Sequence, residues 1–171
     1  MVTDLAEVRR LAESKQAENI DFRRFLTAHH VPEEPFHILA GEIQQHTDCA
    51  ACGNCCRYTL VNVTAHDLDT IAEHLGMPPA EVVRLYTMPD PESPSQRVLR
   101  NERDACAFLD GNLCLIYEAR PKSCRDFPHV APGVHTLGAR MASVCRNAWF
   151  CPIIYNALEA YKKLVGFHHA A

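Results

Sequence analysis

Nine cysteines are the side chains most able to do chemistry in this chain of 171 residues. Four of them fall within eight residues, in the run Cys49-Ala-Ala-Cys52-Gly-Asn-Cys55-Cys56. The C-x2-C-x2-C spacing lets a compact loop turn successive thiolates toward one centre, as in bacterial ferredoxin loops, and Gly53 supplies backbone freedom. Neighbouring side chains of an extended chain point to opposite sides. We therefore expect Cys55 and Cys56 to serve two sites, or one of them to be a spare thiol.

The later cysteines supply the remaining ligands. Cys106 and Cys114 flank Asp110-Gly111-Asn112, which predicts a tight β-hairpin turn that brings the two thiols together. Two four-coordinate centres would need eight thiolates, and Cys151, on an apolar helix face, reads as a buried ninth thiol. The predicted metal ligands, for one centre or two, are Cys49, Cys52, Cys55, Cys56, Cys106, Cys114, Cys124 and Cys145.

Thiolate ligation favours zinc or an iron–sulfur cluster over magnesium or calcium, and the C-x2-C-x2-C run places an iron–sulfur cluster, for example [4Fe–4S], ahead of zinc. Basic side chains near the cysteines could offset the thiolate charge: Arg57, Arg120, Lys122, Arg125 and Arg146. Three histidines are alternative ligands, although a solvent-facing position or a hydrogen-bond donor role in the core explains them more simply: His46, His66 and His129.

The distribution of apolar and charged residues restricts the compartment and the partners. The N-terminus carries acids and bases where a signal peptide has an apolar core, and no apolar run approaches the roughly 20 residues that cross a bilayer. We therefore expect a cytoplasmic protein without membrane contact, in which clustered cysteines bind metal more often than they form disulfides. The lack of a basic excess argues against nucleic-acid binding, with 17 Lys+Arg against 21 Asp+Glu.

The cysteine-free segment before residue 49 differs in charge from the rest. Residues 1–48 hold nine acids and five bases, whereas residues 49–171 hold twelve of each, so the whole net charge of −4 lies in the first segment. Apolar residues at helical spacing predict one or two amphipathic helices over residues 5–26, and a short helix over 37–45. We divide the chain into a helical extension, 1–48, and a cysteine-cluster domain, 49–171.

Shorter elements connect the cysteines. Residues 58–63 predict a strand that leaves the first cysteine run. Thr64 can cap a helix that ends at Gly76, and a second helix begins after Pro78-Pro79. The outline of these two helices, 64–87, allows a DNA-binding interpretation, although ordinary helical hairpins share it.

The C-terminal half alternates loops with short elements. Proline-rich residues 88–95 and the glycine- and proline-punctuated segment 130–138 predict loops, and residues 98–100 a strand. Residues 148–165 predict a helix that starts or kinks at Pro152. The expected fold class is α+β: mainly helical, with a small antiparallel sheet made from residues 57–63 and the 105–117 hairpin, organised around cysteine-ligated metal.

The order of the motifs resembles that of a known family. The motifs are Cys49-x2-Cys52-x2-Cys55-Cys56, Cys106-Ala-Phe-Leu, Cys114-Leu-Ile-Tyr, Arg120-Pro121, Cys124-Arg-Asp-Phe-Pro128 and a later cysteine that opens a helix. Over roughly residues 49–150 they resemble the CxxCxxCC (YkgJ-like) cysteine-cluster family. The resemblance implies a zinc- or iron-chelating protein and names no reaction.

Three hypotheses about function follow. The first is a small cytoplasmic metal-binding protein that holds an iron–sulfur cluster or zinc. The second is an iron–sulfur electron-transfer or enzyme component that acts on a partner protein. The third is a metal- or redox-responsive regulator that binds DNA through residues 64–87.

Overall fold

The computed structural model describes residues 1–102 and 104–169. Its internal contacts group the chain into two units. Unit 1 contains residues 1–48 together with the chain after Phe127, and unit 2 contains Cys49–Phe127. The division into an extension, 1–48, and a domain, 49–171, stays a prediction, because the contacts show only which segments pack together.

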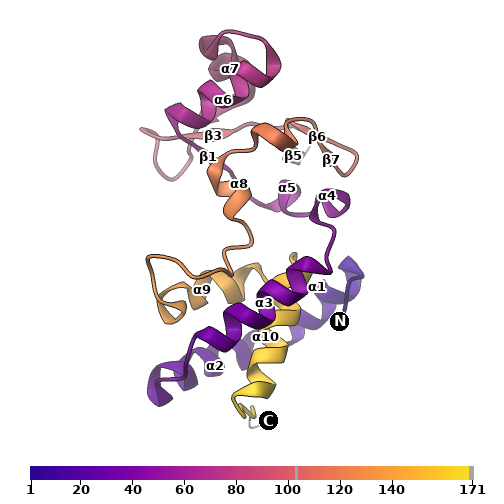
Figure 1. Cartoon of the computed structure of the whole chain (residues 1–171), viewed down its shortest axis with the longest axis vertical. Helices are drawn as coiled ribbons and strands as arrows, with labels where there is room; N and C mark the ends of the chain where they lie inside the picture. The colour runs from indigo at the N-terminus through magenta and orange to yellow at the C-terminus, as the bar shows by residue number, and fades with distance from the viewer. Residues whose placement is uncertain (103, 170–171) are drawn as a thin grey trace. The chain divides into compact units, whose positions relative to one another are not determined.

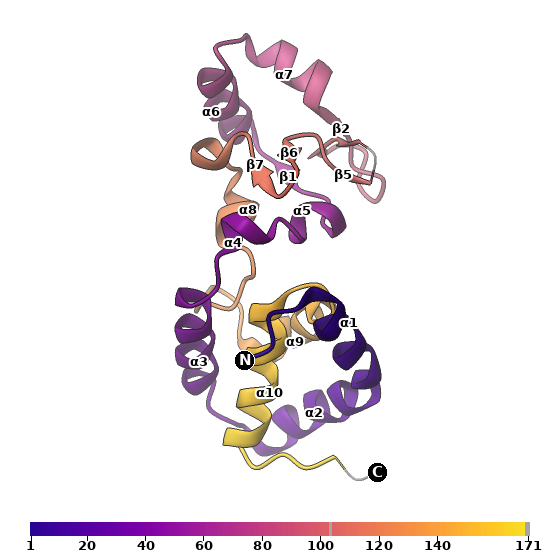
Figure 2. The same ribbon diagram turned by 90° about the vertical axis from the view of Figure 1, so that its right-hand side faces the viewer.

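Unit 1 is helical. Its elements are α1 (Leu5–Ser14), α2 (Gln16–His29), α3 (Glu34–Gln45), α9 (Leu137–Asn147) and α10 (Pro152–Leu164). Helix α10 packs against α1, α3 and α9, as Figure 2 shows, and α2 packs against α9. The Tyr161 ring lies edge-on to the rings of Phe22 and Phe36, with centroids 5.8 and 5.5 Å apart, and all three side chains are fully buried.

Local signals explain most of these helices. Residues 5–26 form parts of two helices, and Pro35 lies in the first turn of α3, where a missing N–H costs nothing. The last helix starts at Pro152, one of the two outcomes predicted for that proline. Helix α9 was not predicted, although Leu137, Met141 and Val144 are buried at helical spacing along it.

The helices of unit 2 are shorter. They are α4 (Cys49–Cys52), α5 (Cys55–Tyr58), α6 (Ala65–Leu75), α7 (Pro79–Tyr86), the 3-10 helix η1 (Tyr117–Ala119) and α8 (Lys122–Asp126). Thr64 and Asp67 form a capping box at the start of α6, and Gly76 ends the helix with φ +65°. Both ends of α6 and the start of α7 therefore confirm the prediction.

Three small antiparallel sheets complete unit 2 (Figure 1). Strands β1 (Asn62–Val63), β3 (Arg97–Leu99) and β2 (Thr87–Pro89) form one sheet in that order. Strand β4 (Asn101–Glu102) pairs with β5 (Ala105–Cys106), and β6 (Leu109–Asp110) pairs with β7 (Leu113–Cys114). The predicted α+β class is confirmed.

The predicted sheet was wrong in detail. Residues 55–58 are helical, so the strand after the cysteine run is limited to Asn62–Val63, and it pairs with β3. Cys106 and Cys114 do not lie opposite each other across one hairpin, because each belongs to its own short strand pair. Residues 88–89, predicted as loop, extend β2, and the segment after Pro121 forms α8.

A hydrophobic core joins these elements. Val61, Ile71, Val82, Leu99 and Ile116 are buried in it, and Cys56, Cys114 and Cys124 pack against it. No helix in the described ranges is long and apolar enough to cross a membrane.

Candidate metal centre

Four thiols of unit 2 share one neighbourhood, which we call the thiol cluster: Cys56, Cys106, Cys114 and Cys124. Within every pair of the cluster, charge on one thiol affects the pKa of the other. Cys106 belongs to the core of unit 2, and the other three pack against that core. Four separate elements, α5, β5, β7 and α8, therefore bring one thiol each to the core of unit 2.

Cys106 and Cys114 end two similar turns. After Cys106, the Ala107 N–H donates to the Arg100 carbonyl oxygen at 2.9 Å, and after Cys114 the Leu115 N–H donates to the Phe108 oxygen at 2.9 Å. The backbone N–H two residues further on donates to each thiol, from Phe108 and from Ile116 respectively. Such N–H···S bonds favour the thiolate form, which is the form that binds metal.

Burial opposes ionisation at these two thiols. Desolvation raises the pKa of Cys106 to about 11 and also raises the pKa of Cys114, despite the backbone N–H bonds. A repeated pattern in the sequence could have predicted these two turns. In Cys106-Ala-Phe108 and again in Cys114-Leu-Ile116, a cysteine is followed two positions later by a buried apolar residue.

Cys56 differs from its partners. A hydrogen bond with the Cys55 side chain lowers the pKa of Cys56 to about 7, against the effect of burial, and Arg57 and Arg120 lower it further. The neighbouring cysteines of the run therefore contact each other instead of pointing apart, because residues 55–58 are helical rather than extended.

Cys124 lies in the first turn of α8, where its N–H donates to the Pro121 oxygen at 2.9 Å. Burial raises its pKa to about 12. Two side chains outside the cysteine motifs hold α8 in place. Asp67 Oδ1 accepts the Lys122 N–H at 2.9 Å, and Ser123 Oγ donates to the Asn62 oxygen at 2.9 Å.

Asp67 is a supporting residue that the sequence reasoning missed. Its carboxylate also accepts the Thr64 N–H at 3.0 Å and the Thr64 hydroxyl at 2.7 Å. Burial raises its pKa, but the bonds from Thr64 and Lys122 outweigh burial, and the pKa lies below its ordinary value. Its position three residues after Thr64, the spacing of a capping box, could have revealed it.

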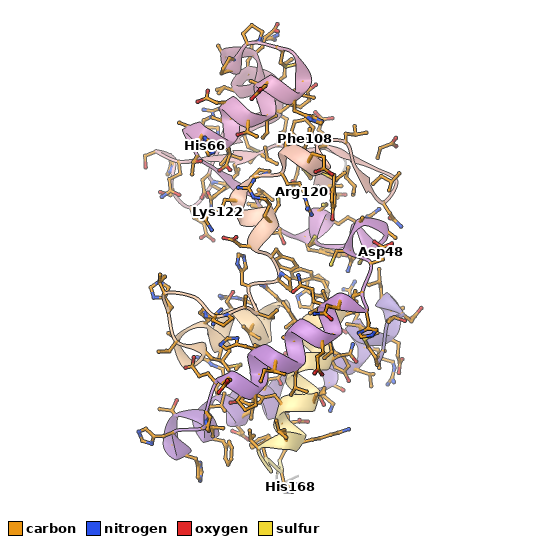
Figure 3. The ribbon with its side chains drawn as sticks, in the orientation of Figure 1. Asp48, His66, Phe108, Arg120, Lys122 and His168 are labelled. Carbon is orange, nitrogen blue, oxygen red and sulfur yellow. The ribbon has the colours of Figure 1, made fainter. Side chains whose placement is uncertain are left out.

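Arg120 supplies positive charge beside the cluster. Its guanidinium carbon lies 3.4 Å from the centroid of the Tyr117 ring, and its charge lowers the pKa of Cys56, Cys114 and Cys124. Figure 3 labels Arg120 and Lys122: Lys122 begins α8, and Arg120 directly follows η1. Of the predicted basic neighbours, Arg57 and Arg120 thus act on the cluster, and Lys122 forms an ion pair with Asp126.

The other predicted ligands have different surroundings. Cys49 is exposed and Cys52 is partly buried, both on the loop of residues 49–56. Cys55 is partly buried on the same loop, and its side chain contacts the cluster through the hydrogen bond with Cys56. Cys145 belongs to unit 1, on α9, where burial raises its pKa to about 11, and the charges of Lys162 and Arg23 lower it. Cys151 also lies in unit 1 and is buried at the start of α10. His46, His66 and His129 are exposed.

The donor set of the cluster fits a thiophilic metal. It contains four thiols, two backbone N–H···S bonds and an adjacent guanidinium, which suit a four-thiolate zinc ion or an iron–sulfur cluster. Within residues 1–102 and 104–169, no group of three or more His, Cys, Asp or Glu side chains is already arranged so that it could hold a metal ion.

Fold and site together define a small α+β protein with a thiol-rich candidate metal centre. The chain belongs to the CxxCxxCC family, whose domain is described as a putative zinc- or iron-chelating domain, and the match covers residues 48–152. The match spans more than half of the chain and runs through every cysteine, as the motif order predicted. No curated protein and no solved structure matches the chain.

Proposed function

We propose that the protein binds one metal centre, a zinc ion or an iron–sulfur cluster, through the thiolates of Cys56, Cys106, Cys114 and Cys124. The observation that carries the proposal is that these four thiols, from four elements spread over 69 residues, lie in or against one hydrophobic core, where each affects the pKa of the others. Family membership supports zinc or iron as the metal.

The electrostatics of the cluster support the same proposal. Burial raises the pKa of Cys106, Cys114 and Cys124, so the free thiols stay protonated near neutral pH. The positive charge of a bound metal ion stabilises several buried thiolates at once. The thiols therefore release their protons when the metal binds. Arg57 and Arg120 would offset part of the remaining negative charge.

The four thiols suit two kinds of metal centre. The C-x2-C-x2-C run favoured a [4Fe–4S] cluster, but of the loop thiols it is Cys56 that joins the thiol cluster through mutual charge effects. Four thiolates satisfy tetrahedral zinc as well as they satisfy an iron–sulfur cluster. Cys49, Cys52, Cys55 and Cys145 remain predicted ligands, which a second centre would need.

Metal and acid-labile sulfide analysis of the anaerobically purified chain tests the proposal. One zinc per chain without sulfide identifies a zinc centre, and iron with sulfide identifies a cluster. A chain that contains neither metal after purification, and takes up neither on reconstitution, would contradict the proposal. Iron with sulfide would also make an electron-transfer role with a partner protein the next function to test.

The DNA-binding alternative gains nothing from the structure. The α6–α7 pair forms as predicted, but Arg84 on α7 lies 3.6 Å from Glu81, and Val82 is buried in the core. A cytoplasmic location stays a prediction from the sequence.

A further inference from the structure

One arginine side chain fastens the cysteine loop, residues 49–56, to the turn at residues 110–112. Arg57 Nη1 donates to the Gly53 carbonyl oxygen at 2.9 Å. Its Nη2 donates to the Gly111 oxygen at 2.6 Å and to Asn112 Oδ1 at 2.9 Å. Because the guanidinium is a rigid plane with several donors, these bonds hold the loop and the turn in one arrangement.

The loop and the turn also approach each other closely in backbone. Gly53 is buried and has a φ of +57°, a conformation that favours glycine. A Cβ added there would lie 2.8 Å from the Asn112 carbonyl oxygen and 3.0 Å from the Asn112 Cα. No side chain fits between the two segments, so the contact that Arg57 secures depends on glycine.

The two segments that Arg57 connects each lie next to a member of the thiol cluster in the sequence. Cys56 directly precedes Arg57, and Cys114 follows Asn112 by two residues. Helix α4 of the loop contacts β7, and α5 contacts β5, so both strands that carry thiols touch the segment that Arg57 holds. The Arg57 contact therefore joins the segment that carries Cys56 to the segment that carries Cys114.

We propose that Arg57 is a positioning residue of the metal centre, which holds Cys56 against Cys114 and slows the release of bound metal. The inference rests on the proposed function, since it assigns Arg57 a role at that same site. Hydrogen bonds to a charged donor are strong enough that losing them should speed metal release about tenfold or more.

Full-length variants loaded with Co²⁺ or Zn²⁺ test the inference. Arg57→Gln removes the guanidinium, and Gly53→Ala puts a methyl group into the contact. Arg84→Gln is the control, because Arg84 belongs to the same unit and its guanidinium forms an exposed ion pair with Glu81 on α7, at 3.6 Å. The measurements are the rate of Zn²⁺ transfer to a chelator and the absorption spectrum of bound Co²⁺, which reports the arrangement of the thiolates.

We expect Arg57→Gln and Gly53→Ala to release Zn²⁺ about tenfold faster than the wild type and to shift the Co²⁺ spectrum. Arg84→Gln should stay within about twofold, with an unchanged spectrum, because an exposed ion pair contributes little. In the double variant the two effects should not add, because both act on one contact. If Arg57→Gln does not fold, Asn112→Ala replaces it in the test. We expect Asn112→Ala to increase the rate of Zn²⁺ release by a smaller factor.

The failures are distinguishable. A wild-type chain that binds neither Co²⁺ nor a reconstituted iron–sulfur cluster would overturn the proposed function and this inference together. A wild-type chain that binds metal, with Arg57→Gln releasing Zn²⁺ at the wild-type rate and giving the wild-type Co²⁺ spectrum, would overturn the inference alone. A changed release rate with an unchanged spectrum would also overturn it, since that pattern reports general destabilisation.

Discussion

At the scale of single residues, Cys106 and Cys151 show why position matters more than residue type. Both thiols are buried, with 8% and 6% of their surface exposed. Cys106 lies among three other thiols of unit 2, whereas Cys151 begins α10 in unit 1. Burial alone therefore does not separate the two thiols, and the proposed assignment of Cys106 as a ligand rests on the other thiols around it.

This pair gives a matched test of the ligand assignment. We expect Cys106→Ser to lose most of its bound metal, because a hydroxyl is a poor replacement for a thiolate. Cys151→Ser buries a hydroxyl to the same extent and should keep the wild-type metal content. Metal analysis after purification under identical anaerobic conditions makes the comparison, and equal metal loss in both variants would refute the assignment.

At the scale of elements, local signals predicted more than distant pairings did. Both ends of α6 were predicted correctly, because Thr64 and Gly76 act on the backbone within a few residues of their own positions. The pairing of β5 with β4 was missed, since the Asp110-Gly111-Asn112 turn explains only β6 and β7. The thiol cluster could be predicted as a set of candidates, but its membership depends on contacts between segments far apart in sequence.

Asp67 connects two elements, and its removal should weaken unit 2. Asp67→Ala loses the capping box of α6 and the bond to the Lys122 N–H that holds α8. We expect unit 2 to lose about 2 kcal/mol of stability, and metal to be held less tightly because α8 carries Cys124. Hydrogen exchange of the unit 2 amides at increasing urea concentration measures this stability. Asp69→Ala, which changes an exposed residue on the same helix, is the control. Equal stability of the two variants would contradict the assigned role.

A charge network joins α2 and α10 in unit 1 and predicts a pH dependence. Lys162 Nζ lies 2.8 Å from both Glu18 and Glu159 oxygens, and Lys15 also pairs with Glu159. Burial raises the pKa of Glu159, but the two lysines outweigh burial and lower it below its ordinary value of 4.5. The network therefore adds stability above about pH 4.5, and this stability is lost as the pH falls through the lowered pKa.

The variant Glu159→Gln tests this linkage. Between pH 7 and about pH 3, unit 1 of the wild type should lose stability more steeply than unit 1 of Glu159→Gln, because only the wild type must protonate the paired carboxylate. The single tryptophan, Trp149, lies in unit 1, so its fluorescence follows the unfolding of that unit in urea. Glu13→Gln, which removes an exposed ion pair with Arg9, should keep the wild-type slope. Parallel pH profiles for the wild type and Glu159→Gln would disprove the linkage.

At the scale of the whole molecule, the two units differ in what stabilises them. Unit 1 has helices of 10 to 14 residues and a core with three fully buried aromatic rings. Unit 2 has strands of two or three residues, and its core includes Cys106 with three further thiols packed against it. Metal binding is a large source of folding free energy in small thiolate sites, about 10–16 kcal/mol in zinc-finger peptides.

Removal of the metal should therefore affect the units unequally. After anaerobic chelation, we expect backbone amides of unit 2 to lose protection from hydrogen exchange. The Trp149 fluorescence transition should keep its urea midpoint, because all four cluster thiols belong to unit 2. A chelated chain in which unit 2 keeps its protection, or in which unit 1 loses as much stability as unit 2, would contradict this account.

The proposed metal centre is held by four thiolates and by no other protein ligand. X-ray absorption of the metal in the anaerobically purified chain measures its ligands directly. We predict a first shell of sulfur only, with four sulfur atoms at about 2.3 Å if the metal is zinc. If the metal is iron, we predict sulfur with iron–iron scattering, as in a cluster. A first shell that contains nitrogen or oxygen ligands, or a wild-type spectrum retained after the four cluster cysteines are replaced by serine, would contradict the claim.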